Sequence, residues 1–499
     1  MSLITARARC GPAAFRATRL QCRTMTSQAQ LAGKEEGDIS SVFVSLSGAT
    51  REPLPTRFRD LKYSLVAGKE DKVIASWNRL LKALAVENDL ISTWKSAIIP
   101  SIEFNNLEFE IEKYKPEIQK RGAAVIRGVV PEAEARLYKF EIEEYVKKNP
   151  HTKAFPAHDP QVYELYWSEP QLKARAHPNL LATQRTLMQA LWHSSSPDAK
   201  ISLSEPLTYA DRLRIRQPGD ATFALGPHID GGSVERWERN GYGLGGVYDR
   251  IFDGEWEKYD PWDAATRIEA VSDLYNGAGA CSMFRMFQGW LSMSVCGPLQ
   301  GTLLVNPAVK LSTAYMLLRP FFQPVREGLS SEAFLAPGNW AFTGGEHMTS
   351  ELQGATPSHA QELNDVLHPH LELSRTMVHM PEVRPGDFVV WHCDTIHAVD
   401  KVHSGKSDSS VLYIPVCPTT EINAKYLVRQ REAFINGTPG PDFPGGKGES
   451  DHVDRPGPSF ISEKSGRRAM GLERLSGARD RSLPGARAVV EQANSILGF

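Results

Sequence analysis

The stretch 226-GPHIDGGSVERW-237 places His228 and Asp230 two residues apart, after an apolar run and before two glycines. A His-x-Asp tripeptide occurs by chance in many long chains, so the pair alone does not distinguish a metal site from a polar turn. An imidazole and a carboxylate at the end of a strand form a metal site only when a further ligand arrives from elsewhere in the chain. The surrounding sequence therefore has to supply that ligand and a fold that brings it close.

A third candidate ligand lies in the stretch 385-PGDFVVWHCDTIHAVD-400. Its first three residues predict a turn, the apolar run up to His392 predicts a strand, and His397 follows five residues later. Two histidines and one aspartate form the three-ligand face that non-haem Fe(II) uses, which leaves positions of an octahedral ion open. We therefore predict His228, Asp230 and His397 as metal ligands, with an insertion between the two distant strands. The other ring nitrogen of His228 then needs an acceptor that orients the ring.

The chain before His228 predicts a β-hairpin with room beside the metal. The stretch 212-RLRIRQ-217 alternates, PGD follows as a turn, and 221-ATFALGPHID-230 returns. With a period of two, Thr222 and Gly226 share the face of His228, and both are small. Leu225 is expected on the opposite, buried side. The alternative is a strand with one polar face and no metal.

Patterns elsewhere predict an α+β chain. Apolar runs at 121–130, 284–295, 301–307 and 409–418, separated by Gly/Pro turns, predict an antiparallel sandwich or barrel. Periodic or capped segments predict helices at 72–91, 131–148, 179–193, 308–320 and 486–497. The long connections 236–280 and 325–370 are expected to form lids whose tips set specificity.

The chain divides into a sequence of predicted regions. Residues 1–34 hold five arginines with Ala, Ser and Thr and, before Glu35, no acidic residue, which is typical of a mitochondrial transit peptide. The alternatives are a disordered basic tail or a start at Met25, with the protein then cytoplasmic. Residues 35–120 are expected to be an N-terminal helical region, 121–430 the β-rich domain, and 431–499 a Gly/Pro-rich tail with a C-terminal helix.

The composition argues against several classes of function. The chain has 499 residues, 41% of them hydrophobic and 23% charged, with a formal net charge of -2. This near balance gives no reason to expect nucleic acid or an anionic membrane as a partner. The six cysteines form no C-x-x-C pair and are interpreted as reduced thiols, and no apolar run is long enough for a transmembrane span. The G-x-G-x-x-G at 241–246 follows polar residues rather than a strand, which argues against a nucleotide-binding loop. No G-x-S-x-G is present, so the sequence gives no support for nucleophilic hydrolysis.

Longer motifs carry a resemblance to known families. Four motifs resemble Fe(II)/2-oxoglutarate oxygenases of the phytanoyl-CoA hydroxylase type and occur in the order found in those enzymes. They are 121-RGAAVIRGVVPEAEA-135, 226-GPHIDGG-232, 301-GTLLVNP-307 and 386-GDFVVWHCDTIH-397. The chain is more closely similar to domain-of-unknown-function family 1479, which is regarded as oxygenase-like. The stretches that carry this closer resemblance, which spans residues 60–470, are 211-DRLRIRQPGDATFALGPHIDGGSVERW-237, 284-FRMFQGWLSMS-294, 317-LLRPFF-322, 385-PGDFVVWHCDTIHAVDKVHSG-405 and 409-SSVLYIPVCP-418.

The resemblance implies a double-stranded β-helix, the jelly-roll or cupin-like core, that carries Fe(II) on His228, Asp230 and His397. In such enzymes 2-oxoglutarate chelates the iron and is decarboxylated by O2, and hydroxyl replaces a hydrogen of the substrate. An aspartate ligand favours hydroxylation over halogenation, and the expected substrate is a small molecule. Two alternatives stay open: a cupin-type metalloenzyme that does not use 2-oxoglutarate, and a non-catalytic ligand-binding scaffold.

One departure from the family pattern concerns the residue that holds the distal carboxylate of 2-oxoglutarate. Many relatives use an arginine or lysine shortly after the second histidine, whereas the strand 409-SSVLYIPV-416 has no basic residue. A guanidinium group binds a carboxylate through two hydrogen bonds, so Arg285 is the first candidate for this role. The further candidates are Arg214, Arg216 and Arg319 as cations and Ser410 and Tyr413 as hydrogen-bond donors.

Other residues are expected to line or support the metal pocket, namely Thr222, Gly226, Trp391 and His392. Trp391 and His392 end the apolar strand before His397, which places them close to this ligand along the chain. Each arginine proposed for 2-oxoglutarate is equally suited to a structural ion pair, which is the alternative to a role at the site.

Overall fold

The structure is a computed structural model that describes Lys34 and residues 36–48, 52–221, 224–278, 280–443, 445–477 and 484–499. The predicted leader, residues 1–34, therefore lies outside the described residues except for Lys34, and Thr222 of the predicted pocket also lies outside them. Among the described residues, no helix combines the length and the apolar character needed to cross a membrane.

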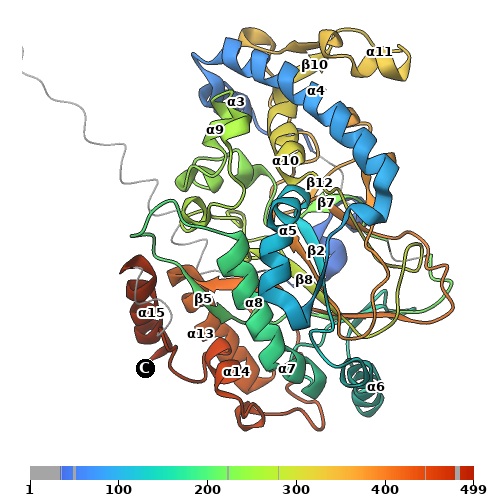
Figure 1. Ribbon diagram of the computed structural model, residues 1–499, viewed down its shortest axis with the longest axis vertical. Coiled ribbons are helices and arrows are strands. Elements are labelled where there is room, and N and C mark those ends of the chain that lie inside the picture. The colour runs from blue at the N-terminus through green and yellow to red at the C-terminus, as the bar shows by residue number, and fades with distance from the viewer. Residues whose placement is uncertain are drawn as a thin grey trace, which may run out of the picture.

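Two β-sheets form the centre of the described part of the chain (Figure 1). The larger sheet has eight strands there and the smaller has five, and the neighbours within each sheet are antiparallel except β1 and β2. The larger sheet is, in spatial order, β1 (Ser101–Glu103), β2 (Ala123–Arg127), β14 (Phe388–His392), β8 (Phe287–Ser292), β16 (Ser409–Tyr413), β6 (Leu213–Arg216), β4 (Val162–Tyr163) and β3 (Ala154–Phe155). The smaller sheet is β12 (Gln361–Glu362), β7 (His228–Ile229), β15 (His397–Val399), β9 (Leu303–Val305) and β13 (Val378–His379). The predicted α+β class with antiparallel sheets is confirmed.

One face of the larger sheet packs against helices. Because successive side chains of a strand point to opposite faces, Phe388 and Val390 of β14 face one way, and Val389 and Trp391 face the other. The first pair joins Leu412 of β16 in a buried cluster with the helices. These helices are α5 (Leu107–Arg121), α6 (Glu132–Lys148) and α8 (Pro178–Leu191). Figure 1 shows α5 and α8 side by side next to β2 and β8.

The other face of the larger sheet packs against the smaller sheet. Val389 and Trp391 share a buried cluster with Leu303 of β9 and Val399 of β15, so this cluster lies between the sheets. Trp290 of β8 belongs to it and meets Trp391 edge-on, with the ring centroids 5.8 Å apart. The space between the sheets also holds the candidate site.

A third cluster joins the smaller sheet to helices in the upper part of Figure 1. Ile229 of β7 packs there with residues of α4 (Glu70–Trp94) and α10 (Val309–Leu318). Trp77 of α4 stacks on Tyr315 of α10, with the ring centroids 5.3 Å apart. The helix predicted from apolar spacing at 72–91 is thus a packing element of the core.

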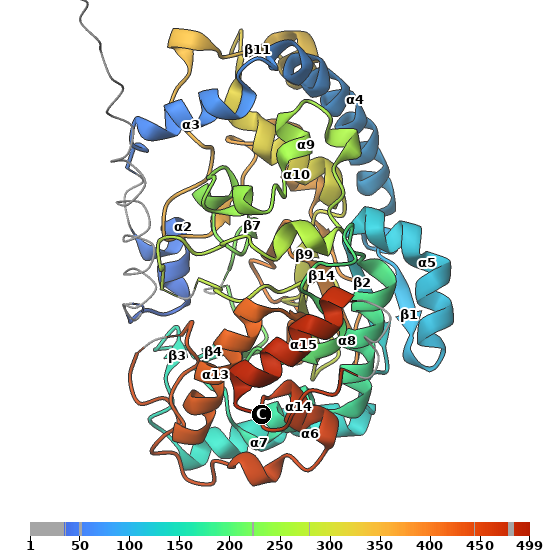
Figure 2. The ribbon, with the colours of Figure 1, turned by 90° about the vertical axis from the view of Figure 1, so that its left-hand side faces the viewer.

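The C-terminal part of the chain forms a layer of its own against the paired strands β5 (Ser202–Leu207) and β17 (Cys417–Thr419). Figure 2 shows its helices α13 (Glu421–Asn436), α14 (Lys464–Ala469) and α15 (Pro484–Leu497) together in the lower half of the molecule. The remaining elements are α2 (Val44–Ser47), α3 (Arg57–Val66), α7 (Glu169–Ala176), α9 (Asp249–Phe252), α11 (Ser331–Leu335), α12 (Leu373–Thr376) and the paired strands β10 (Phe322–Pro324) and β11 (Trp340–Phe342). The helices predicted from the sequence are confirmed as α4, α6, α8, α10 and α15.

The predicted hairpin is wrong, because its two strands lie in different sheets. β6 pairs with β16 and β4, whereas β7 pairs with β12 and β15. The segment between β6 and β7 forms backbone hydrogen bonds with residues after His397 instead. Gly219 N donates to His403 O at 2.8 Å, and Val399 N donates to Leu225 O at 3.0 Å. The PGD turn therefore begins a crossing from one sheet to the other.

Candidate metal centre

The predicted metal ligands come together at the ends of neighbouring strands. His228 of β7 and His397 of β15 are register partners, and Asp230 follows directly after β7. The Nε2 atom of His228 lies 3.7 Å from one carboxylate oxygen of Asp230, and Nε2 of His397 lies 3.9 Å from the other. Each residue thus offers one ligand atom, all within 4.8 Å of one another, which is a spread that suits a single metal ion.

Backbone carbonyls orient both imidazole rings. Nδ1 of His228 lies 2.7 Å from the carbonyl oxygen of Gly226, and Nδ1 of His397 lies 3.0 Å from that of Thr395. A carbonyl only accepts, so Nδ1 carries the proton in each ring and the lone pair of Nε2 faces the shared centre. The acceptor that the sequence analysis required for His228 is therefore the Gly226 carbonyl.

The surroundings keep the ligand atoms in the protonation states that bind a metal. Burial, together with the neighbouring His228, lowers the pKa of His397 to about 3, so the imidazole is neutral at pH 7. Burial raises the pKa of Asp230, but His397, His228 and Arg285 outweigh it, so the pKa lies below its ordinary value. Two neutral imidazoles and a carboxylate form a donor set that fits Fe(II) and related divalent ions.

A pocket of about 120 Å³ lies between the two sheets beside the ligands. Its walls include Trp290, Leu303, Trp391 and Tyr413, which come from both sheets. Leu225 also lines it, so the expectation that this residue faces away from the pocket is wrong. Residues 224–227 lie outside β7, and the period of two therefore does not apply to them.

A larger cleft of about 890 Å³ adjoins this pocket. The two cavities share Asp230, Gly231, Cys281, Arg285 and Gln288. Much of the cleft wall comes from the predicted insertion 236–280, and α13 supplies another part. The three predicted ligands therefore line a small inner pocket, and Asp230 also lines a larger outer cleft.

An N-terminal strap, which we define as Lys34 and residues 36–43, also covers the site. Phe43 lines the inner pocket and meets the His228 ring edge-on, with the centroids 4.7 Å apart. Lys34 forms a buried ion pair with Asp273 and donates to the Ala280 carbonyl at 2.8 Å. The sequence analysis missed the strap because this region is mostly polar and short of regular periodicity.

Arg285 lies beside the metal centre. Its guanidinium is 3.7 Å from a carboxylate oxygen of Asp230 and lies over the Tyr209 ring at 5.4 Å from the centroid. It lines both cavities. Among the described residues, Arg285 has no other ion pair and no side-chain hydrogen bond, so its single ion-pair partner is a predicted metal ligand.

Arg212 is a second cation at the inner pocket, and the sequence analysis missed it. It lines that pocket with Tyr413 and Phe443, and its guanidinium lies 4.7 Å from the centroid of the Phe443 ring. Its carboxylate neighbour, Asp211, is 3.5 Å away. The signal was present, because Arg212 opens the same alternating run that contains Arg214 and Arg216.

The other predicted anchor residues are engaged elsewhere in the structure, outside the linings of both cavities. Arg214 donates to the Gly301 carbonyl at 2.8 Å, and Arg216 forms a 2.5 Å ion pair with Asp220. Arg319 donates to the Phe322 carbonyl at 2.7 Å, and Ser410 donates to Asp408 at 2.5 Å. Their partners are backbone carbonyls and carboxylates of the fold, as in the structural alternative.

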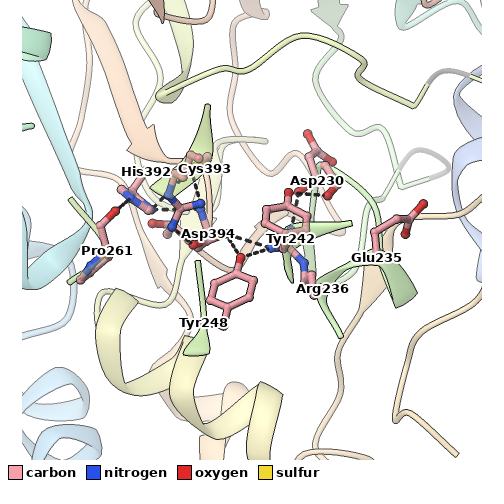
Figure 3. Close-up of polar contacts among 12 residues, drawn as sticks. Asp230, Glu235, Arg236, Tyr242, Tyr248, Pro261, His392, Cys393 and Asp394 are labelled. Atoms are coloured by element: carbon pink, nitrogen blue, oxygen red, sulfur yellow. Dashed lines mark hydrogen bonds and ion pairs between the residues drawn. The ribbon is translucent and has the colours of Figure 1, made fainter. Parts of the chain in front are cut away.

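His392 lies behind the metal centre rather than in the pocket (Figure 3). Nε2 lies 2.9 Å from the Pro261 carbonyl, and Nδ1 accepts a hydrogen bond from Asp394 N at 3.0 Å. Its ring stacks on Trp192, with the centroids 4.8 Å apart. Burial lowers its pKa to about 3, and the Arg267 charge adds to this effect. Both ring nitrogens of His392 are therefore engaged in hydrogen bonds that support the loop before His397.

Comparison with known proteins places the chain in a family. The sequence profile of the Gig2-like family matches residues 52–472. The chain belongs to the Gig2-like family. It is 30% identical over 404 residues to YbiU of Escherichia coli (strain K12). This match covers 77% of this chain and 89% of YbiU.

Solved structures of other proteins agree with this Gig2-like assignment. The crystal structure of GlcNAc inducible gene 2 (GIG2, DUF1479) from Candida albicans is 30% identical and matches with a TM-score of 0.79, over 90% of this chain and 97% of that one. A protein of Salmonella typhimurium LT2 that is provisionally named an oxidoreductase is also 30% identical, with a TM-score of 0.71 over 85% of this chain and 99% of that one. The resemblance to family 1479 is thus confirmed, while its oxygenase character is a matter for proposal.

Proposed function

We propose that this Gig2-like protein is a non-haem Fe(II)- and 2-oxoglutarate-dependent dioxygenase that hydroxylates a small molecule. The observation that carries the proposal is the convergence of His228, Asp230 and His397 in the inner pocket, where Asp230 also borders the outer cleft. A purely structural His–Asp cluster has no need of two rings whose Nδ1 atoms are fixed by carbonyls and whose Nε2 atoms converge.

The facing sheets also support the fold part of the proposal. In a double-stranded β-helix, two antiparallel sheets face each other and the metal lies between them near one end. Here the ligand strands β7 and β15 belong to the smaller sheet, and the larger sheet supplies the opposite wall through Trp290 and Trp391. We propose that these two sheets are the two halves of such a core.

Each cavity has a distinct role in this proposal. Bound Fe(II) would supply the oxidising chemistry, in which 2-oxoglutarate, O2 and a substrate C–H group become succinate, CO2 and an alcohol. The inner pocket would hold 2-oxoglutarate, because it is small and is lined by Arg212 and Tyr413 as well as by the predicted ligands. The outer cleft, which is larger, would hold the substrate and bring it to the open side of the metal.

Arg285 and Arg212 are the two candidates for binding the distal carboxylate of 2-oxoglutarate. Arg285, the candidate from the sequence, contacts the metal ligand Asp230, whereas the distal carboxylate of a chelating five-carbon acid lies at the far end of the chain. Arg212 lines only the inner pocket and is therefore the second candidate.

We expect Arg212→Gln to raise the apparent KM for 2-oxoglutarate by at least tenfold, because a charge-assisted pair is lost, and to change Mn(II) affinity little. Arg285→Gln should change both the Mn(II) affinity and the KM of the substrate. Arg214→Gln is the matched control, since this arginine of β6 lies two residues after Arg212 but outside both cavity linings. The reverse pattern would assign the distal carboxylate to Arg285.

The decisive test of the function is turnover with 2-oxoglutarate. The protein is loaded anaerobically with Fe(II), mixed with 2-oxoglutarate and O2, and assayed for succinate with and without a metabolite library. We expect slow uncoupled succinate formation that a substrate accelerates, and none with His228→Ala or Asp230→Ala.

The alternatives predict other outcomes of the same assay. Turnover of a library compound without 2-oxoglutarate would indicate a cupin-type metalloenzyme of another class. Binding of Fe(II) or Mn(II) and a ligand with no turnover at all would indicate a non-catalytic scaffold. Either result would contradict the dioxygenase proposal.

We further propose a mitochondrial location, from the basic and acid-poor residues 1–34. A fusion of these residues to a fluorescent protein should reach mitochondria, and diffuse cytoplasmic fluorescence would favour the alternative.

A further inference from the structure

We infer that Arg236 and Asp394 are positioning residues that hold the two ligand-bearing loops in register for the metal; this inference rests on the proposed metal site. Asp230 directly follows β7 and His397 begins β15, so the two come from segments far apart in the sequence, and a buried polar cluster contacts the loop after Asp230 and the loop before His397. Figure 3 shows Arg236 and Tyr242 of this cluster beside Asp230. We call the side chains of Arg236, Tyr242, Tyr248, Tyr259, Arg267 and Asp394 the buttress.

Arg236 joins the two loops directly. Its Nη2 donates to the backbone carbonyl of Asp230 at 2.7 Å, and its Nη1 donates to the Asp394 carboxylate at 2.9 Å. Nη1 also lies 2.8 Å from the Tyr248 hydroxyl, which in turn donates to Asp394 at 2.9 Å. The guanidinium is fully buried, so this geometry has no competition from water.

The Asp394 carboxylate is held on both oxygens. Its second oxygen accepts hydrogen bonds from Arg267 at 2.5 Å and from Tyr259 at 3.2 Å. Asp394 lies three residues before His397 and one before Thr395, whose carbonyl orients the His397 ring. Fixing Asp394 therefore fixes the loop that aims the Nε2 atom of His397.

The loop after Asp230 is held at two consecutive carbonyls. Arg236 donates a hydrogen bond to the carbonyl of Asp230, and the Tyr242 hydroxyl donates to the carbonyl of Gly231 at 2.7 Å. Gly231 and Gly232 have φ angles of 81° and 80°, a left-handed conformation that turns the chain back toward the buttress. With its backbone fixed in this way, the Asp230 carboxylate retains only its side-chain torsions.

The buttress contains a buried cluster of charged side chains. Two buried arginines share one buried aspartate, and the two guanidinium groups hold the pKa of Asp394 well below its usual range despite burial, which raises it. A buried ion cluster adds little net stability, because its desolvation cost offsets the attraction. Its value in this position is geometric, since it sets the separation between Asp230 and His397.

This assignment also gives a role to the predicted insertion 236–280. The residues that it supplies to the buttress run from Arg236 to Arg267, and two of them, Tyr242 and Arg267, also line the outer cleft. The insertion is predicted to form a lid over the substrate. We infer that its part from Arg236 to Arg267 also supports the segments that carry the predicted ligands.

The test is anaerobic titration with Mn(II) and with Co(II), whose visible absorption reports ligand geometry. Asp394→Asn and Arg236→Lys should weaken Mn(II) binding tenfold or more and change the Co(II) spectrum, as loss of outer-sphere support does in other metal sites. Tyr248→Phe removes two hydrogen bonds and no charge. It is expected to fold normally and to weaken binding severalfold.

Asp408→Asn is the matched control. Asp408, directly before β16, is a buried carboxylate held by Arg136 through bonds of 2.8 and 2.9 Å, and it lines neither cavity. It should lower Tm as the buttress variants do and leave the Mn(II) Kd and Co(II) spectrum unchanged.

The outcomes separate this inference from the proposed function. A lower Tm in the buttress variants, with the Mn(II) Kd and the Co(II) spectrum of the wild type, would overturn the inference. Normal metal binding in the wild type, with weakened binding in the variants but no 2-oxoglutarate turnover, would support the inference and contradict the dioxygenase. A wild-type protein that binds neither ion would overturn both.

Discussion

Glu449 shows how one buried residue makes stability depend on pH. It lies fully buried, where one carboxylate oxygen accepts hydrogen bonds from the backbone N–H groups of Tyr166 and Trp167 at 2.6 and 2.8 Å. Burial raises its pKa to about 7 against an ordinary value of 4.5, because desolvation disfavours the charged form and outweighs these hydrogen bonds.

The sign of the effect follows from linkage. A raised folded-state pKa means that folding takes up a proton between pH 4.5 and 7, so the stabilisation is complete below pH 4.5 and is lost as pH rises to 7. The loss amounts to about 3 kcal/mol for this shift. Glu449→Gln cannot ionise, so we expect its free energy of unfolding, relative to the wild type, to increase across this window.

Urea denaturation of both proteins at pH 5, 6, 7 and 8 measures this difference. The exposed Glu108→Gln is the control and should follow the wild type at every pH. Parallel curves for the wild type and Glu449→Gln would show that Glu449 stays ionised in the folded protein.

At the scale of elements, the N-terminal strap gives the inner pocket part of its wall. Phe43 is buried, lines this pocket and meets the His228 ring, while Leu46 in the adjoining helix α2 is exposed. Truncation of a buried Phe costs about 3–5 kcal/mol and leaves a cavity. We expect Phe43→Ala to lower Tm and to weaken binding of 2-oxoglutarate to the Mn(II) form, because water then reaches the pocket.

Calorimetric Tm and the 2-oxoglutarate Kd of the Mn(II)-loaded protein check this expectation. Leu46→Ala is the matched control and should change neither. An unchanged Kd in Phe43→Ala, with lowered Tm, would restrict the strap to a structural role.

For the whole molecule, a bound metal should act as a bridge between distant parts of the chain. It would join β7 to β15, whose strands are brought together only by the folded sheet. A ligand that binds only the folded state stabilises it, by about 2.7 kcal/mol at one hundred times its Kd. We expect Mn(II) to raise the Tm of the wild type by several degrees.

Asp230→Ala supplies the control for this bridge. It should show no such rise, and Arg214→Gln, away from the cavities, should respond to Mn(II) as the wild type does. Equal stabilisation of Asp230→Ala would place the bound Mn(II) at some other site.

The sequence predicted the three residues that the structure brings together because their pattern is local. His228 and Asp230 are neighbours, and His397 follows an apolar run that is a strand in the structure. Helices such as α4 were also predictable, because their apolar period appears within one segment. The prediction failed for the hairpin, where the partners of a strand lie far away in the chain and alternation alone does not name them.

The surroundings of the site were less accessible to sequence reasoning. Arg212 was missed because an alternating run does not show which of its arginines reaches a cavity. Asp394 was missed because its partners, Arg236 and Arg267, come from a connection without regular pattern. Phe43 was missed for the same reason, since its contact with His228 joins residues that no local rule relates.

Lys34 gives any proteolytic maturation of this chain a sharp boundary. It is the residue at which the predicted leader ends, and its side chain pairs with Asp273 and reaches the Gly277 and Ala280 carbonyls. Cleavage before Lys34 would keep that tether and add a new α-ammonium group beside it, whereas cleavage after Lys34 would remove the tether. A processing enzyme that errs by one residue would therefore release two forms of the protein that differ in how firmly the wall of the candidate site is held.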